Sequence, residues 1–291
     1  MNNNNCVQVK EFLDDDSETF SYVVYDAESK GAVIIDPVLD FDYASGKTYT
    51  QSAERIIRFV QEKHLDVAWV LETHAHADHL SAAPFLKEQL KAPIAIGEHI
   101  TEVQKIFKQV YNLDKEFLPN GEHFDRLLKD GDVFHVGNMT IRVIHTPGHT
   151  PADIAYLINE SKVFVGDTLF NPDVGTARCD FPGGSASTLY QSIQTLFKLD
   201  TTTEMYICHD YPPEGREHQC KTSVGEQKQN NIHVGKNTSE EQFVKWREER
   251  DATLNMPRLI IPAIQVNIRA GQLPPAENND TVYLKVPLNR L

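Results

Sequence analysis

Histidine and aspartate are concentrated in one short segment of the chain, HAHADH at residues 74–79. Imidazole nitrogen and carboxylate oxygen together bind zinc, iron and manganese in proteins. On an extended loop alternate residues point the same way, so His74, His76 and Asp78 can share one side. A lone histidine is usually an ordinary core or surface residue, but three histidines and one aspartate within six positions favour a metal site.

Three later segments carry the same residue types, and each follows an apolar run that is typical of a strand. His145 and His149 follow IRVI, Asp167 follows VFVG, and His209 follows MYIC. Because strand ends at one edge of a sheet lie side by side, residues far apart in sequence can converge there. We therefore predict a metal centre that draws on all four segments. The residues alone permit either one metal or two.

The apolar periodicity around these segments predicts alternating strands and helices. The predicted strands are 20–25, 32–36, 67–71, 93–96, 132–136, 139–144, 152–158, 162–165 and 205–208. The predicted helices are 52–63, 81–91, 100–110, 187–199 and 240–251. Strands and helices alternate in each half of the chain, which favours an α/β fold in which helices cover sheets.

No linker, repeat or change of composition divides the chain, so we expect a single domain over residues 1–291. Residues 253–291 are rich in proline and show no clear periodicity. We expect this part to be an extended, irregular C-terminal segment that wraps the surface.

The composition excludes several classes of function. Hydrophobic residues make up 40% and charged residues 24% of the chain, which is typical of a globular protein. The formal net charge of −14 argues against nucleic-acid binding, and an anionic substrate would need a local cluster of arginine or lysine. The sequence contains no long apolar run and starts MNNNNCVQVKEF, so we expect neither a transmembrane helix nor a signal peptide. The four cysteines form no CxxC pair, and a reducing cytoplasm is the expected location.

The motifs HAHADH, HTPGHT and GDTLF and the pair His209-Asp210 resemble, in this order, the signature of the metallo-β-lactamase superfamily. The resemblance covers Val7 to about Asn231 and implies an αββα four-layer sandwich with the metal at the sheet edges. Within the superfamily the chain resembles the persulfide dioxygenases of bacterial type, a branch related to the glyoxalase II hydrolases. The segments that carry this second resemblance are GDTLFNPDVGTARCDFPGG at 166–184, HDY at 209–211 and NMPRLIIPAIQVNIRAG at 255–271.

The resemblance to persulfide dioxygenases implies that His74, His149 and Asp167 bind one iron(II) ion per chain. Two histidines and one carboxylate with open coordination positions are the arrangement of non-haem iron oxygenases. The other four residues of the superfamily signature would orient these ligands and bound water, whereas a two-metal hydrolase would use them as ligands. These four residues are His76, Asp78, His79 and His209.

The same resemblance implies that glutathione persulfide and dioxygen react to sulfite and glutathione, without an organic cofactor. Arg178 lies in the motif GTARCDF, and we expect it to hold a substrate carboxylate. Further predicted substrate contacts are Tyr211, Arg216 and Lys221, whereas the adjacent Cys179 is expected to be an ordinary buried residue. No nucleic acid or membrane is expected as a partner, and a homodimer is the oligomeric state that we consider.

Two other functions are compatible with these residues. One is a glyoxalase II-like hydrolase, in which two metals activate a hydroxide that cleaves a glutathione thioester. The other is a metal or persulfide sensor without turnover. Metal content and oxygen consumption distinguish the three functions, because they differ in the number of metals and in the need for dioxygen.

Overall fold

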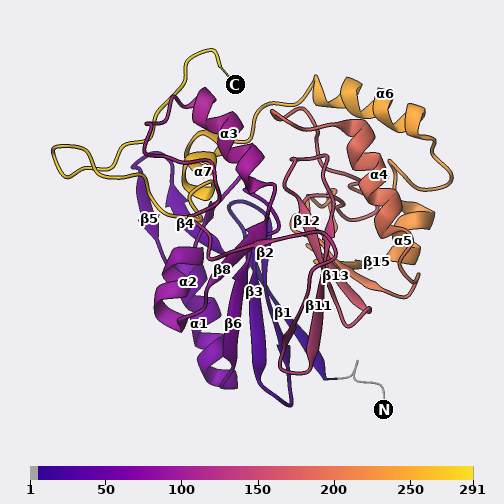
Figure 1. The fold of residues 1–291 in the computed structure, drawn as a ribbon. Coiled ribbons are helices and arrows are strands. Elements are labelled where there is room, and N and C mark those ends of the chain that lie inside the picture. The colour runs from indigo at the N-terminus through magenta and orange to yellow at the C-terminus, as the bar shows by residue number, and fades with distance from the viewer. Residues whose placement is uncertain (1–5, 291) are drawn as a thin grey trace.

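The computed structural model describes residues 6–290. Its centre consists of two six-stranded sheets that face one another (Figure 1). The strand order in the first sheet is β1 (Val7–Asp14), β2 (Thr19–Asp26), β3 (Gly31–Ile35), β6 (Asp66–Leu71), β8 (Ile94–Gly97) and β9 (Arg126–Leu128). The order in the second is β10 (Val133–Val136), β11 (Met139–His145), β12 (Ile154–Ile158), β13 (Lys162–Phe164), β14 (Glu204–Tyr206) and β15 (Lys221–Ser223). A small third sheet has the order β5 (Lys47–Tyr49), β4 (Val38–Asp42) and β7 (Leu80–Ser81).

Helices cover the outer face of each large sheet (Figure 1). Those that pack on the first sheet are α1 (Gln51–Lys63), α2 (Ala83–Leu90), α3 (Ile100–Val110) and α7 (Ile260–Asn267). Those on the second sheet are α4 (Ala186–Leu196), α5 (Val224–Asn230) and α6 (Glu240–Asp251). The molecule is therefore a sandwich of four layers, helices, sheet, sheet and helices, which confirms the predicted αββα fold.

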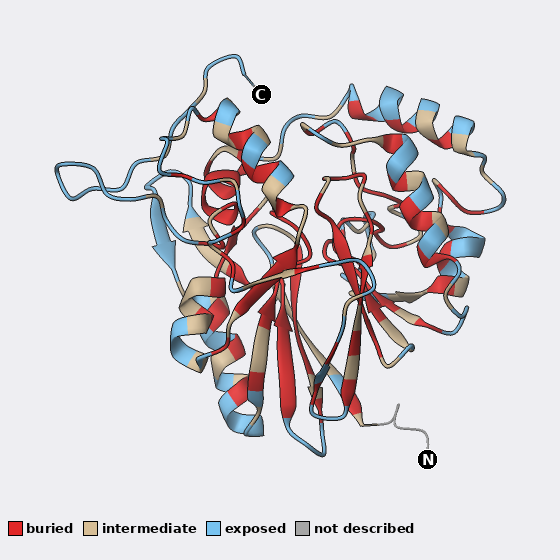
Figure 2. Ribbon diagram, viewed as in Figure 1, coloured by how far each residue is buried: buried red, intermediate tan, exposed pale blue. Residues whose placement is uncertain are grey.

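Alternating side chains along each strand hold these layers together. Val23 and Ile34 belong to the apolar cluster under α1, α2 and α3. Their neighbours Val24 and Ile35 belong to a second cluster that also contains Tyr156 of the opposite sheet. Successive residues of a strand point to opposite faces, so one strand contributes to both clusters. The strands are accordingly buried along most of their length, while the helices are exposed on their outer sides (Figure 2).

Each predicted strand and helix is present, with ends shifted by up to three residues. The expectation that 253–291 is irregular was wrong for α7, which is buried along nearly its whole length. A helix that is buried on nearly all sides lacks the alternation of apolar and polar faces by which helices are recognised in a sequence. Pro262 also argued against a helix at this position. Proline is tolerated there because it stands in the first turn, where the backbone N–H has no intrahelical partner. The extent of the single domain stays a prediction.

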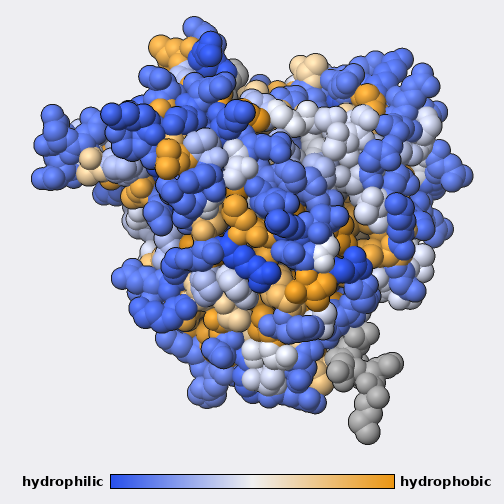
Figure 3. Space-filling model, in the orientation of Figure 1, coloured by the Kyte–Doolittle hydropathy of each residue, from blue (hydrophilic) through white to orange (hydrophobic). Residues whose placement is uncertain are grey.

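The surface agrees with the composition. The face shown in Figure 3 is mainly hydrophilic, with small hydrophobic patches between the charged residues. None of the helices between residues 6 and 290 combines the length and the apolar character that a bilayer crossing requires.

Candidate metal centre

Two side chains hold the loop after β6 in place, one that follows the neighbouring strand and one from a covering helix. Asp36, which follows the parallel strand β3, accepts hydrogen bonds from Thr73 N at 2.7 Å and from Thr73 Oγ1 at 2.9 Å. On the helix side, the Asn267 amide at the end of α7 donates to the carbonyl oxygens of His76 and His79, both at 2.8 Å. The segment that bears four of the predicted site residues is therefore fixed by a neighbouring strand and by the C-terminal helix.

The loop after β11 turns sharply before the next histidine. Gly148 has a φ of +141°, and a Cβ atom at this position would lie 2.3 Å from the Cα atom of Leu189 in α4. Only glycine permits this conformation and this close approach. The turn directs His149 toward the centre, where its Nδ1 donates to the carbonyl oxygen of Arg178 at 2.8 Å. Its Nε2 is thereby left free to bind a metal.

Three ligand atoms from three segments form a first cluster, the triad His74, His149 and Asp167. Each residue offers one atom, and these atoms all lie within 4.8 Å of one another. Asp167 Oδ2 lies 3.5 Å from His149 Nε2 and 3.8 Å from His74 Nε2. All three residues are at most 6% exposed.

The remaining signature residues form a second cluster beside the first, with ligand atoms of His76, Asp78, His79 and His209 within 4.8 Å of one another. Asp78 Oδ2 lies 3.2 Å from both His79 Nδ1 and His209 Nε2. Asp167 stands between the clusters, because its second oxygen, Oδ1, is 3.4 Å from His209 Nε2. His76 also faces Asp36, at 3.1 Å.

The donor atoms fit a metal ion. His74 Nε2, His79 Nε2, His209 Nε2 and Asp167 Oδ1 are buried and have no hydrogen-bond partner among the described residues. Buried polar atoms normally have partners, so such a group of converging lone pairs needs an explanation, and a cation supplies one. Burial, together with the neighbouring His76 and His149, lowers the pKa of His74 well below its usual value. His74 is therefore a neutral imidazole with a lone pair available for a metal.

Several buried residues that surround the centre were not identified from the sequence. Thr19 Oγ1 lies 3.2 Å from His209 Nδ1 and 3.3 Å from Asp78 Oδ2, so β2 supports the second cluster. Thr73 Oγ1 lies 3.0 Å from His74 Nδ1, and Asp153 Oδ1 lies 3.8 Å from the same atom. Burial raises the pKa of Asp153 to about 6. The sequence signal for these residues is weak, because each is a common polar residue outside the histidine motifs.

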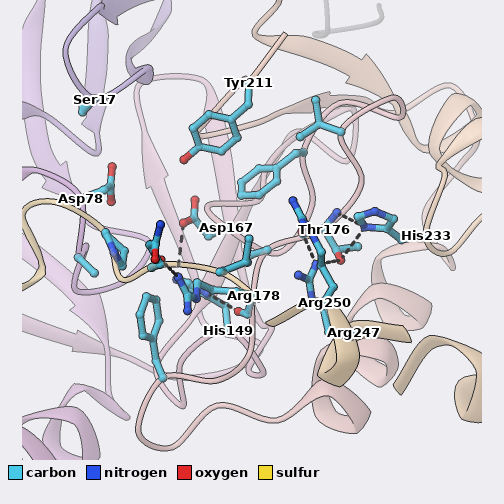
Figure 4. Close-up of a pocket in the computed structure, with 18 of the residues that line it drawn as sticks. Ser17, Asp78, His149, Asp167, Thr176, Arg178, Tyr211, His233, Arg247 and Arg250 are labelled. Carbon is cyan, nitrogen blue, oxygen red and sulfur yellow. Dashed lines mark hydrogen bonds and ion pairs between the residues drawn. The ribbon is translucent and has the colours of Figure 1, made fainter. Parts of the chain in front are cut away.

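A cavity of about 700 Å³ opens beside the two clusters. His149, Asp167 and Asp78 line it on one side, and Arg247 and Arg250 of α6 line it on the other (Figure 4). The predicted substrate contact Tyr211 also lines the cavity, and its ring stacks on His209 with 5.8 Å between the ring centroids. Its hydroxyl end is directed toward Asp167 and Asp78 (Figure 4). The cavity therefore connects the metal cluster to a cationic side.

The three predicted cationic contacts have different surroundings. Arg178 lines the cavity, but Asp180 accepts two hydrogen bonds from its guanidinium, both at 2.6 Å, and Asn255 O accepts a third. Arg216 is paired with Asp210 and Asp173, and Lys221 with Glu204. Neither Arg216 nor Lys221 lines the cavity beside the metal cluster, and both border a separate surface hollow instead. The structure thus brings Arg178 and Tyr211 to the centre, but not the other two.

Comparisons with known proteins agree with this geometry. The family model described as metallo-beta-lactamase superfamily matches residues 14–209. A probable metallo-hydrolase of Burkholderia pseudomallei is 47% identical over 97% of this chain and 99% of its own length. Glyoxylase B2 of Dictyostelium discoideum is 46% identical over 99% of both chains. The mitochondrial persulfide dioxygenase ETHE1 of Bos taurus is 29% identical over 93% of this chain and 91% of its own.

A solved structure extends the likeness to the fold. ETHE1 from Myxococcus xanthus is 31% identical and superposes with a TM-score of 0.72, covering 91% of this chain and 100% of that chain. The chain is therefore similar to proteins whose names indicate either metallo-hydrolase or persulfide dioxygenase activity.

Proposed function

The chain belongs to the metallo-beta-lactamase superfamily and is homologous to ETHE1 persulfide dioxygenases, and from this premise we propose that it oxidises glutathione persulfide. In this reaction glutathione persulfide, dioxygen and water give sulfite and glutathione. The outer sulfur loses four electrons and dioxygen gains four, so no further oxidant is needed. The histidine and aspartate residues could bind a metal whichever reaction the protein catalyses.

The observation that carries the proposal is the separation of the signature residues into two clusters. In the triad of His74, His149 and Asp167 no two side chains share a hydrogen bond, so their lone pairs remain available. In the second cluster Asp78 Oδ2 is shared by His79 and Thr19, so this carboxylate already has partners within the protein, whereas the Nε2 atoms of His79 and His209 have no hydrogen bond to any residue that the structure describes. A triad of two histidines and one carboxylate favours a single iron(II) ion.

The chain's own residues position the reactants. Iron(II) held by the triad would supply adjacent open positions and the electron transfer that the reaction requires. His149 and His74 are oriented by hydrogen bonds at their Nδ1 atoms, which leaves Nε2 for the metal. Tyr211 lies over the cavity with its hydroxyl directed toward Asp167, where it can donate to a sulfur or oxygen atom of the substrate.

One observation favours a second candidate, a two-metal hydrolase of glutathione thioesters. Asp167 presents one oxygen to each cluster, so this carboxylate would help to hold both ions of a two-metal enzyme. The similarity to Glyoxylase B2 of Dictyostelium discoideum points the same way. In both candidate reactions the substrate is a derivative of glutathione, but the two enzymes differ in the number of metals and in the need for dioxygen.

A combined assay tests the proposal. Protein purified without oxygen is analysed for its metals, then supplied with glutathione persulfide in an oxygen electrode and, separately, with S-lactoylglutathione. We expect about one iron per chain, oxygen uptake and sulfite release. Two metals per chain with thioester cleavage and no oxygen uptake would establish the hydrolase instead. Tight metal binding with turnover of neither substrate would favour a sensor.

The cellular location follows from the cysteines rather than from the site. All four cysteines, Cys6, Cys179, Cys208 and Cys220, are free. Unpaired cysteines are typical of a reducing compartment, and we propose the cytoplasm.

A further inference from the structure

Four arginines line the cavity beside the metal clusters, although the protein carries a net charge of −14. They are Arg178, Arg247, Arg250 and Arg258. Asp16, Asp78 and Asp167 line the same cavity, and an arginine without a carboxylate partner there attracts anions to this place. Which of these arginines can bind an anion depends on which of them already has a partner.

Two of the four, Arg178 and Arg247, already bind partners within the protein. Asp180 and the carbonyl oxygen of Asn255 occupy the guanidinium of Arg178. Arg247 is only 3% exposed, pairs with Asp251 at 2.5 Å, and donates to the carbonyl oxygen of Thr176. An additional anion would have to displace these carboxylates, so neither arginine is well suited to capture a substrate.

The other two are exposed and lack an acidic partner. Within residues 6–290, Arg250 makes no ion pair, and its one side-chain hydrogen bond is a long contact of 3.5 Å to Thr253 Oγ1. Arg258 has neither a hydrogen bond nor an ion pair with any described residue. The positive field on the α6 side also affects His233, whose pKa is lowered to about 3 by burial and by Arg247 and Arg250. These two guanidinium groups therefore remain available to a ligand.

The two arginines lie on different sides of the cavity. Arg250 is the penultimate residue of α6, on the side of Thr176 and His233 (Figure 4). Arg258 also borders a small hollow together with Asp16 and His79, on the side of the second metal cluster. His149 and Asp167 of the metal triad line the same cavity. A ligand that reaches both arginines therefore passes over the metal ligands.

We propose that Arg250 and Arg258 bind the two carboxylates of the glutathione portion of the substrate. Glutathione carries one carboxylate at each end and its sulfur on the central residue. If Arg250 and Arg258 hold the two ends at different sides of the cavity, the sulfur lies between them, over the metal site. The planar guanidinium groups suit carboxylates, because each can donate two parallel hydrogen bonds. This inference rests on the proposed function for the identity of the thiol, and it assigns specificity to two residues outside the signature motifs.

The test compares Arg250→Gln and Arg258→Gln with Arg58→Gln, an exposed arginine of α1 that does not line the cavity. The substrates are glutathione persulfide and the persulfide of glutathione diethyl ester, which lacks both carboxylates. We expect each cavity variant to raise KM for glutathione persulfide about tenfold, as for the loss of one hydrogen-bonded charge. The value of kcat, the iron content and the kinetics with the ester should stay as in the wild type.

A binding measurement separates this inference from the proposed reaction. S-methylglutathione, which cannot be oxidised at a persulfide, is titrated calorimetrically into the metal-loaded wild type and the three variants. About tenfold weaker binding by the Arg250 and Arg258 variants alone supports the inference, even if the wild type consumes no oxygen with persulfide. Unchanged binding and unchanged KM in both variants would overturn the inference, whether or not the protein is a dioxygenase.

Discussion

The Nδ1 atom of His149 lies 2.8 Å from the carbonyl oxygen of Arg178, so a metal ligand of the triad is oriented by the backbone of the loop that carries this arginine. The Arg178 side chain in turn holds the loop, through two hydrogen bonds to Asp180 and one to the carbonyl oxygen of Asn255. Arg178 can therefore affect the orientation of His149 by holding this loop, without any contact with the substrate. The sequence predicted instead that Arg178 holds a substrate carboxylate, and the two roles make different predictions.

Arg178→Ala should lower iron retention and kcat, by roughly the 10–100-fold typical of residues that orient metal ligands. Asp180→Ala removes the other half of the same contact and should have a similar effect. The value of KM for glutathione persulfide should change little in either variant, because neither change removes a contact with the bound substrate. Steady-state kinetics with iron quantified on the same samples provide the measurement. A large increase of KM confined to Arg178→Ala, with normal iron content, would instead establish direct substrate binding.

The two metal clusters predict a hierarchy among the ligands. Asp167→Ala removes the one carboxylate of the triad and should abolish both iron retention and activity. His79→Ala changes the second cluster and should retain the iron, with a loss of activity of roughly 10–100-fold. Iron analysis and oxygen uptake on both variants are the measurement. Loss of iron in His79→Ala as complete as in Asp167→Ala would show that the second cluster also binds a metal.

The positions of most strands and helices, and the segments that take part in the site, could be predicted because they depend on local apolar periodicity. The partition of HAHADH between the two clusters does not follow from local pattern, although the resemblance to persulfide dioxygenases implied it. The alternation of an extended loop grouped His74 with His76 and Asp78, whereas the structure places the ligand atom of His74 with His149 and Asp167. The loop is not a strand, and its course is set by Asp36, which lies 37 residues from Thr73, and by Asn267, which lies 188 residues from His79. Such contacts are fixed by tertiary packing, which local pattern does not contain.

Asn267 offers a direct test of that packing. Asn267→Ala removes hydrogen bonds to the carbonyl oxygens of His76 and His79 and to Ser81 N, at about 1 kcal/mol each, so the free energy of unfolding should fall by about 3 kcal/mol. Gln265→Ala is the matched control, because Gln265 also makes three hydrogen bonds to backbone atoms, those of Ile261 and Lys285.

Both variants should be destabilised in urea to a similar degree, but only Asn267→Ala should bind iron more weakly, because Gln265 does not contact the metal loop. Chemical denaturation and metal titration with a competing chelator measure the two effects separately. Equal metal affinity in the two variants would show that α7 stabilises the fold without positioning the ligands.

The final prediction concerns the dependence of stability on pH, and it uses a histidine away from the metal clusters. His233 packs against Trp246 with 3.8 Å between the ring centroids, and its Nδ1 accepts a hydrogen bond from Thr176 N at 2.9 Å. Burial, Arg247 and Arg250 lower its pKa to about 3, whereas an unfolded histidine titrates near pH 6.5. Between these values the unfolded chain binds a proton that the folded protein does not.

The contribution of His233 to stability is therefore complete above about pH 6.5 and is lost as the pH falls toward about 3, by about 1.4 kcal/mol per pH unit. His233→Asn keeps an acceptor for Thr176 N but does not titrate. Between pH 7 and pH 5 the wild type should lose about 2 kcal/mol more stability than this variant. Arg250→Gln should show an intermediate loss, because it removes one of the two cations that oppose protonation. Urea denaturation at both pH values provides the measurement, and parallel losses in wild type and His233→Asn would show that the folded protein protonates His233 as readily as the unfolded chain does.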